Sequence, residues 1–127
     1  MKADSVQIRP WIFLVLLFGF AAGCRRSGTF YSQTMTDSEN ITAAVLSYRI
    51  MTGKLPTTEQ GLDTLMIRPD DLSPEAKWVV LFKEIPTDPW GNEYEYTLLS
   101  IDHVPNFEIR SLGQDGIRSE DDIVSTH

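Results

Sequence analysis

Cysteine, histidine and positive charge are scarce in this sequence of 127 residues, and each shortage excludes a class of function. One cysteine cannot form a disulfide within the chain, and one cysteine with two histidines cannot build a zinc cluster. The net charge is -7, whereas binding to a phosphate backbone needs a basic face, so nucleic acid is an unfavourable partner. Hydrophobic residues make up 42% and charged residues 23% of the chain, which is ordinary for one globular domain.

Side chains that could perform catalysis are also few and scattered. Ser111, Ser119 and His103 form no recognisable nucleophile arrangement. Asp88 begins an Asp-Pro-Trp-Gly segment and is better explained as the first residue of a type I turn than as an acid catalyst. A carboxylate pair for glycoside hydrolysis has no supporting pattern of groove-lining aromatic residues. We therefore predict that the chain is not an enzyme and has no small-molecule substrate.

The sequence lacks an apolar run long enough to span a bilayer. The segment 11–22 is uncharged, but it falls short of the roughly 18 residues that a spanning helix needs and matches the apolar region of a secretory signal. Ala21-Ala-Gly-Cys24 follows and resembles a bacterial lipobox, although the usual motif has leucine at the place of Ala21. We expect a lipoprotein-type signal peptide over 1–23 and lipidation of Cys24. The alternative is an uncleaved anchor helix that extends to Arg26.

Both alternatives place the chain beyond about residue 27 outside the cytoplasm and tethered to a membrane. An acidic protein gains no electrostatic attraction to anionic lipid, so the anchor must be covalent or hydrophobic. Arg25, rather than an aspartate, follows the cysteine, which favours the outer membrane over the inner membrane. The expected location is the periplasm-facing side of the cell envelope.

The remaining chain divides into a polar tether over 24–36 and one domain over 37–127. Apolar residues recur at helical spacing after Thr36, which has a glutamate three residues later, as in a capping box. Gly53 is a typical residue just beyond the end of a helix. This pattern predicts a helix over 37–52.

Alternation of apolar and polar residues predicts strands at 93–99 and 107–112, with a break at 101–105 and a short third strand at 123–124. A short helical segment is expected within 57–66. The apolar segment 78–82 is expected to be buried, as either helix or strand. One helix before a small antiparallel sheet predicts an α+β fold of two layers. The predicted core is Ile41, Val45, Tyr48, Leu62, Leu65, Trp90, Tyr94, Tyr96, Phe107, Ile109 and Leu112.

Four blocks of the sequence are similar to the major pseudopilin of type II secretion, protein G. They are Gly53-Lys-Leu-Pro-Thr-Thr-Glu-Gln-Gly-Leu62, Ile85-Pro-Thr-Asp-Pro-Trp-Gly-Asn-Glu-Tyr-Glu-Tyr96, Phe107-Glu-Ile-Arg-Ser-Leu-Gly-Gln-Asp-Gly116 and Ser119-Glu-Asp-Asp-Ile123. The resemblance implies a pilin-like fold, with an N-terminal helix packed on a small antiparallel sheet. It also implies a structural role in type II protein secretion, beside other pseudopilins or secretion components.

The N-terminus departs from this family pattern. A pseudopilin has a prepilin leader followed by a long apolar helix with a glutamate, and neither is present in this sequence, where a lipobox takes their place. We therefore expect that the chain does not polymerise through a standard pilin helix. The alternative function is a stand-alone, lipid-anchored, calcium-binding interaction module outside any secretion filament.

Carboxylates and glycines are concentrated in the segment 112–122, which holds Asp115, Glu120, Asp121 and Asp122. Carboxylate and carbonyl oxygens are the ligands that Ca²⁺ prefers, although the spacing is not that of an EF-hand. From composition alone, a solvated acidic loop is an equally acceptable interpretation.

The resemblance adds a ligand set, because the family's loop binds one calcium through two aspartate side chains seven apart and three backbone carbonyls. Matched by motif position, the side-chain ligands are Asp115 and Asp122, and the carbonyls are those of Leu112, Ile117 and Ser119. Asp121 is the substitute if the register slips by one residue. The expected role of the calcium is to stabilise the fold.

Overall fold

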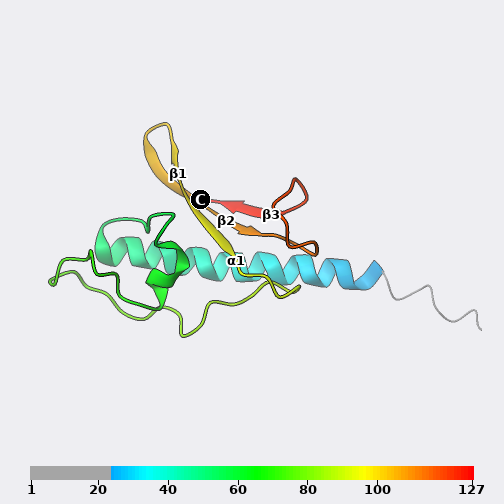
Figure 1. Cartoon of the computed structure of the whole chain (residues 1–127), viewed down its shortest axis with the longest axis horizontal. Helices are drawn as coiled ribbons and strands as arrows, with labels where there is room; N and C mark the ends of the chain where they lie inside the picture. The colour runs from blue at the N-terminus through cyan, green and yellow to red at the C-terminus, as the bar shows by residue number, and fades with distance from the viewer. Residues whose placement is uncertain (1–23) are drawn as a thin grey trace, which may run out of the picture.

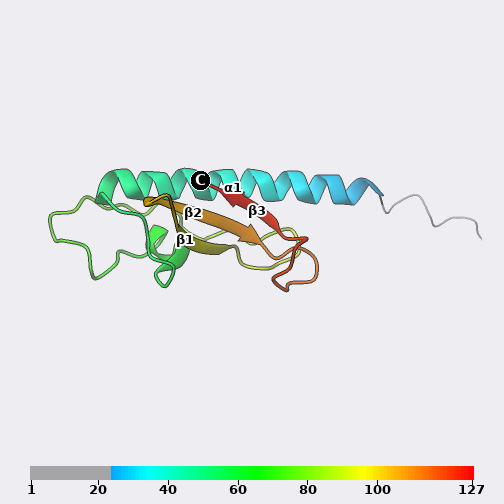
Figure 2. The same ribbon diagram turned by 90° about the horizontal axis from the view of Figure 1, so that it is seen from above.

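A computed structural model describes residues 24–127 and shows one long helix lying across a small sheet (Figure 1). The elements are α1 (Cys24–Thr52), the 3-10 helix η1 (Gly61–Leu65), β1 (Glu95–Ile101), β2 (Val104–Ser111) and β3 (Ile123–Thr126). Figure 2 shows α1 as one layer and the sheet with η1 as the other. The predicted two-layer α+β arrangement is confirmed, whereas the predicted signal peptide lies outside the described residues.

The helix α1 begins earlier than predicted. The expected tether, 24–36, is helical, and Thr36 is no N-cap because its Oγ1 donates within the helix to the carbonyl of Ser32 at 3.1 Å. Thr34 and Ser38 are 0% and 1% exposed, so this polar stretch packs against the rest of the domain. Small hydroxyl side chains give no apolar signal in the sequence, and tertiary packing here outweighs their modest helix propensity.

The end of α1 lies where the sequence predicts it. The amide of Gly53 donates to the carbonyl of Arg49 at 2.8 Å, and Gly53 has a φ of +79°, which a side chain would disfavour. Thr57 and Gln60 then form a reciprocal pair, in which the Thr57 amide donates to Gln60 Oε1 and the Gln60 amide donates to Thr57 Oγ1. This pair precedes η1, so the short helical segment is confirmed.

The sheet has the order β1-β2-β3, and both neighbouring pairs are antiparallel. The predicted break at 101–105 is too long, because β1 and β2 remain paired up to Ile101 and Val104. Only Asp102 and His103 form the turn, and both have positive φ values, 50° and 66°. Two-residue hairpins require such angles, but asparagine and glycine usually provide them, so the sequence gives no strong turn signal here.

The apolar segment 78–82 is neither helix nor strand. Its backbone is held to η1, because the amides of Leu81 and Phe82 donate to the carbonyl of Leu65 at 2.9 and 3.1 Å. Val79 and Val80 are 55% and 56% exposed, which contradicts the prediction that the whole segment is buried. The irregular backbone turns only part of the segment toward the core.

The core lies between α1 and the inner face of the sheet. Nine of the eleven predicted core residues are buried, while Trp90 and Leu112 are half-buried. Ala44, Leu55 and Leu72 also belong to the core. Ser111 is completely buried, although it is polar, because it takes part in the network described below.

Candidate functional site

All five predicted calcium ligands lie in the connection from β2 to β3, residues 112–122, which we call the acidic loop. The structure distributes them unevenly between solvent and interior. Asp115 and Ile117 are exposed, Leu112 and Ser119 are half-buried, and the Asp122 side chain is only 1% exposed. The loop returns the chain to the sheet, where Ile123 pairs with Ser111.

Asp122 is the best-fixed carboxylate of the acidic loop. Its Oδ2 accepts hydrogen bonds from Arg110 Nη1 at 2.8 Å and from the Ser119 amide at 3.1 Å. The Arg110 hydrogen bond holds the pKa of Asp122 below its ordinary value, and the bond from Ser119 acts in the same direction. Asp122 is therefore ionised at neutral pH and ties the end of the loop to β2.

Asp115 and Asp121 make only local contacts. Asp115 Oδ1 accepts a hydrogen bond from the Ile117 amide at 3.1 Å, and Asp121 accepts one from Ser119 Oγ. Within residues 24–127, no group of three or more histidine, cysteine, aspartate or glutamate side chains is placed to hold a metal ion. Any cation in the acidic loop would therefore depend on two carboxylates supplemented by carbonyl oxygens or water.

A buried polar network supports the base of the acidic loop. Asp88, only 3% exposed, accepts hydrogen bonds from the amides of Trp90 and Asn92 at 3.1 and 2.7 Å and from Ser111 Oγ at 2.7 Å. The Ser111 hydroxyl accepts a hydrogen bond from the Gly113 amide at 3.2 Å, and Asn92 Nδ2 donates to the Gly113 carbonyl at 2.7 Å. The loop is thereby held at its first residues.

The predicted turn at Asp88 is confirmed, because the Gly91 amide donates to the Asp88 carbonyl at 2.9 Å. The hydrogen bond from Ser111 to Asp88 and the one from Asn92 to the Gly113 carbonyl were not predicted from the sequence. A side chain on Gly116 would also come within 3.1 Å of Asn92 Oδ1, so the loop passes close to Asn92. The Asp-Pro-Trp-Gly-Asn block was the feature of the sequence that could have indicated these contacts.

The same turn contacts the N-terminal half of α1. The rings of Trp90 and Phe30 meet edge to face, with centroids 5.5 Å apart. The Tyr94 hydroxyl donates to Asp37 Oδ2 at 3.2 Å, and burial raises the pKa of Tyr94 well above its ordinary value. A chain of contacts thus joins the acidic loop, the turn and α1.

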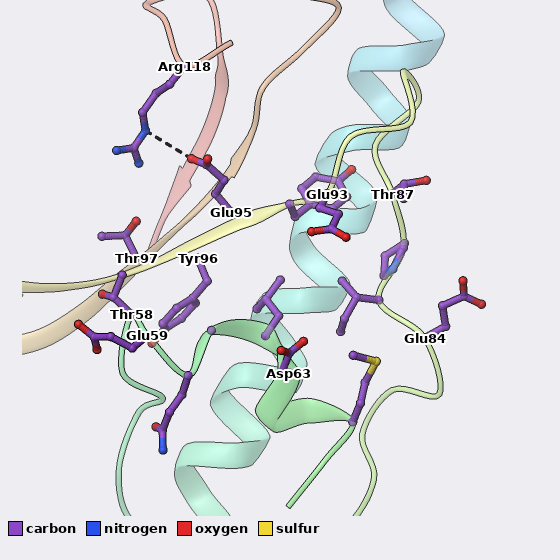
Figure 3. Close-up of a pocket in the computed structure, with 17 residues that line it drawn as sticks. Thr58, Glu59, Asp63, Glu84, Thr87, Glu93, Glu95, Tyr96, Thr97 and Arg118 are labelled. Atoms are coloured by element: carbon purple, nitrogen blue, oxygen red, sulfur yellow. Dashed lines mark ion pairs between the residues drawn. The ribbon is translucent and has the colours of Figure 1, made fainter. Parts of the chain in front are cut away.

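A separate cavity of about 640 Å³ lies between η1, the 84–87 segment and β1 (Figure 3). Carboxylates surround it, and Arg118 of the acidic loop reaches its edge through an ion pair with Glu95 at 3.4 Å. In the part of the chain that the structure describes, neither histidine nor cysteine lines this cavity.

The sequence profile described as "Type II secretion system (T2SS), protein G" matches residues 25–126, which is most of the chain. The chain belongs to the type II secretion system protein G family. Type II secretion system core protein G of Klebsiella michiganensis is 33% identical over 93 residues, which cover 71% of this chain and 63% of that protein. The protein of the same name from Pseudomonas aeruginosa is 35% identical over 82 residues, which cover 63% and 56%.

A crystal structure of the major pseudopilin from the type 2 secretion system of enterohaemorrhagic Escherichia coli matches the fold with a TM-score of 0.63. The identity is 30%, and the match covers 79% of this chain and 89% of that chain. This likeness confirms the pilin-like fold. The chain spans less than two thirds of the length of the Klebsiella and Pseudomonas relatives.

Membership of the protein G family confirms the resemblance found in the sequence. The relatives are named as a secretion-system component and a pseudopilin, so the prediction that the chain is not an enzyme is confirmed as well. In residues 24–127, no helix is both long and apolar enough to cross a membrane.

Proposed function

We propose that this chain is a pseudopilin-like structural component of type II protein secretion on the periplasmic side of the cell envelope. The observation that carries this proposal is the shared arrangement of α1 and the three-stranded sheet, which matches a major pseudopilin over 79% of this chain. The candidate site supports it, because its buried polar network and the Phe30–Trp90 contact position the acidic loop against the turn and α1.

Exposed apolar side chains on α1 support contacts with other secretion components. Leu46 and Ile50 are 40% and 84% exposed and lie four residues apart, which places them on one face of the helix. Together they offer a small apolar contact surface on one face of α1. A neighbouring pseudopilin would bury them.

The test uses the full-length chain in its own bacterium. Leu46→Glu should reduce both the secretion of type II cargo and cross-linking to other pseudopilins, because it places a charge on the contact face. Val79→Glu is the matched control, since Val79 is equally apolar and 55% exposed but lies outside α1. If Leu46→Glu leaves secretion normal, and the unmodified chain does not cross-link to pseudopilins either, the stand-alone module is favoured instead.

The finer proposal is that calcium stabilises the acidic loop. The donor chemistry fits a hard cation, because Asp115 and Asp122 offer only oxygen and both stand in one short connection. They would hold the ion together with the carbonyls of Leu112, Ile117 and Ser119, as the resemblance implies. The ion would supply positive charge that draws the two ends of the loop together.

Calorimetry and thermal melting test the calcium site. Calcium should raise the melting temperature, since a ligand that binds only the folded state stabilises it by about 2.7 kcal/mol at a hundredfold excess over Kd. Asp115→Asn and Asp122→Asn should remove this response. Glu120→Gln, the matched control within the loop, should keep it. Absence of binding heat from the unmodified domain would reduce the loop to a solvated acidic segment.

The last part of the proposal is that Cys24 carries the membrane anchor. It is supported by the small residues that precede Cys24 and by the apolar segment 11–22. The family match begins at residue 25, so lipidation would attach the membrane directly next to the domain. A lipid on Cys24 and the start of α1 would then hold the domain close to the bilayer surface.

A further inference from the structure

The predicted calcium ligand Asp122 already has a cationic partner within the chain. Arg110 Nη1 lies 2.8 Å from Asp122 Oδ2, and the Ser119 amide occupies the same oxygen at 3.1 Å. The other oxygen, Oδ1, is approached only by Ser119 Oγ, at the longer distance of 3.4 Å. One oxygen of this buried carboxylate is therefore bound to Arg110, while the other has only the long contact with Ser119.

Arg110 is held in place independently of the acidic loop. It lies in the central strand β2, opposite Glu95 of β1 and Val124 of β3. Because its neighbours Ile109 and Ser111 are completely buried, Arg110 points to the other face of the sheet.

Glu108, two residues earlier on the same face, fixes the guanidinium from the other side. Glu108 Oε1 accepts from Arg110 Nε at 3.0 Å and from Nη2 at 2.8 Å, and both side chains are only 17% exposed. A guanidinium held in this way loses little freedom when it binds a further carboxylate. The contact with Glu108 therefore preorganises Arg110 for its hydrogen bond to Asp122.

A Ca²⁺ at Asp122 and the guanidinium of Arg110 would attract the same carboxylate and repel each other. Each can neutralise Asp122 and attach the end of the loop to the sheet. Ca²⁺ and the Arg110 guanidinium can therefore each attach the end of the loop, although the two oxygens of Asp122 allow both to be bound at once.

We propose that Arg110 is the cation that fastens the acidic loop to the sheet when no metal ion is bound, and that calcium takes over part of this role when it binds. The second half rests on the calcium site proposed above. The consequence is a domain whose β3 pairing survives removal of calcium, provided that Arg110 is present.

The other arginine near this face provides a matched control. Arg118 lies 3.4 Å from Glu95 and 3.8 Å from Glu108, and its side chain is 56% exposed. Exposed ion pairs at such distances contribute little to stability. Removal of Arg118 should therefore leave the loop closed, although it deletes the same charge from the same region.

The experiment compares Arg110→Met and Arg118→Met with the unmodified protein by amide hydrogen exchange in β3, once in a calcium chelator and once with excess calcium. In chelator, Arg110→Met should lose protection by about tenfold or more, since a charge-assisted hydrogen bond in the loop closure is removed. Calcium should restore most of that protection. The unmodified protein and Arg118→Met should be protected under both conditions.

Each other outcome is decisive. Full protection of Arg110→Met in chelator would overturn the fastening role of Arg110. Calcium that binds the unmodified protein by calorimetry but does not restore Arg110→Met would overturn the exchange of roles. If neither protein binds calcium, the proposed calcium site fails, and the chelator arm alone still decides the role of Arg110. Should Arg110→Met not fold in chelator, Arg110→Lys, which keeps the charge without the fork, should retain at least part of the protection in chelator. Complete loss of β3 protection in Arg110→Lys would count against a role of the positive charge.

Discussion

Asp88 offers the sharpest test of how the acidic loop is positioned. We expect Asp88→Ala to destabilise the domain strongly, although Asp88 lies in a turn and contributes nothing to the apolar core. The side chain is 3% exposed and accepts hydrogen bonds at 2.7 Å from both the Asn92 amide and Ser111 Oγ. The alanine would leave both donors without their acceptor, and Ser111 is completely buried.

The magnitude follows from the number of strong bonds that are lost. A hydrogen bond to a charged group contributes about 1.5–3 kcal/mol to stability, and two short ones are removed here, so we expect a loss of about 3 kcal/mol or more. In a domain of about 100 residues, 1 kcal/mol shifts the melting temperature by about 4–8 °C. Asp88→Ala should therefore lower the melting temperature by more than about 10 °C.

Urea unfolding and thermal melting measure this loss. Asp88→Asn should lie between the alanine variant and the unmodified protein, because the amide oxygen can still accept from the backbone of the turn. Asp70→Ala is the control, since Asp70 is an exposed aspartate in a different connection. If Asp88→Ala were as stable as Asp70→Ala, the network would have no energetic role and the reasoning would be refuted.

Three further predictions concern the core, the acid limit and the N-terminus. Phe107→Ala should lower the free energy of unfolding in urea by about 3–5 kcal/mol, because Phe107 is 1% exposed and stacks on Tyr96 with ring centroids 5.8 Å apart. Val124→Ala, on the exposed side of β3, should lower it far less. Equal losses would contradict the core assignment. The lowered pKa of Asp122 contributes stability that is present above an ordinary carboxyl pKa of about 4 and lost as the pH falls through the lower folded value. Asp122→Asn should therefore flatten the fall of melting temperature below about pH 4. An unchanged dependence of melting temperature on acidic pH would argue against the Arg110 pair. Cys24→Ser should leave an unprocessed precursor in mass spectrometry of the N-terminus, and normal processing would exclude lipidation at Cys24.

Contacts around the Asp-Pro-Trp-Gly turn connect the acidic loop to α1. Trp90 packs on Phe30 of α1, while Asp88 and Asn92 hold the first residues of the loop. Disturbance at the turn should therefore reach both the helix and the loop.

Features that depend on neighbouring residues could be predicted from the sequence. The end of α1 at Gly53, the turn after Asp88 and the alternation of the strands were all correct within a few residues. Each depends on backbone preferences or on side-chain direction over a short segment, such as the positive φ of a glycine after a helix. The identity of the family followed from the same short blocks.

Features that depend on distant partners were decided only by the tertiary structure. The first half of α1 carries few apolar residues, and it is stabilised by packing and by contacts such as that of Asp37 with Tyr94, 57 residues away. The acidic loop was located by its composition, but composition could not show that Asp122 is buried against Arg110 while Asp115 stays in solvent. The physical reason is that burial and charge pairing are properties of the assembled layers, and they arise only when the sheet brings residues far apart in the chain onto one face.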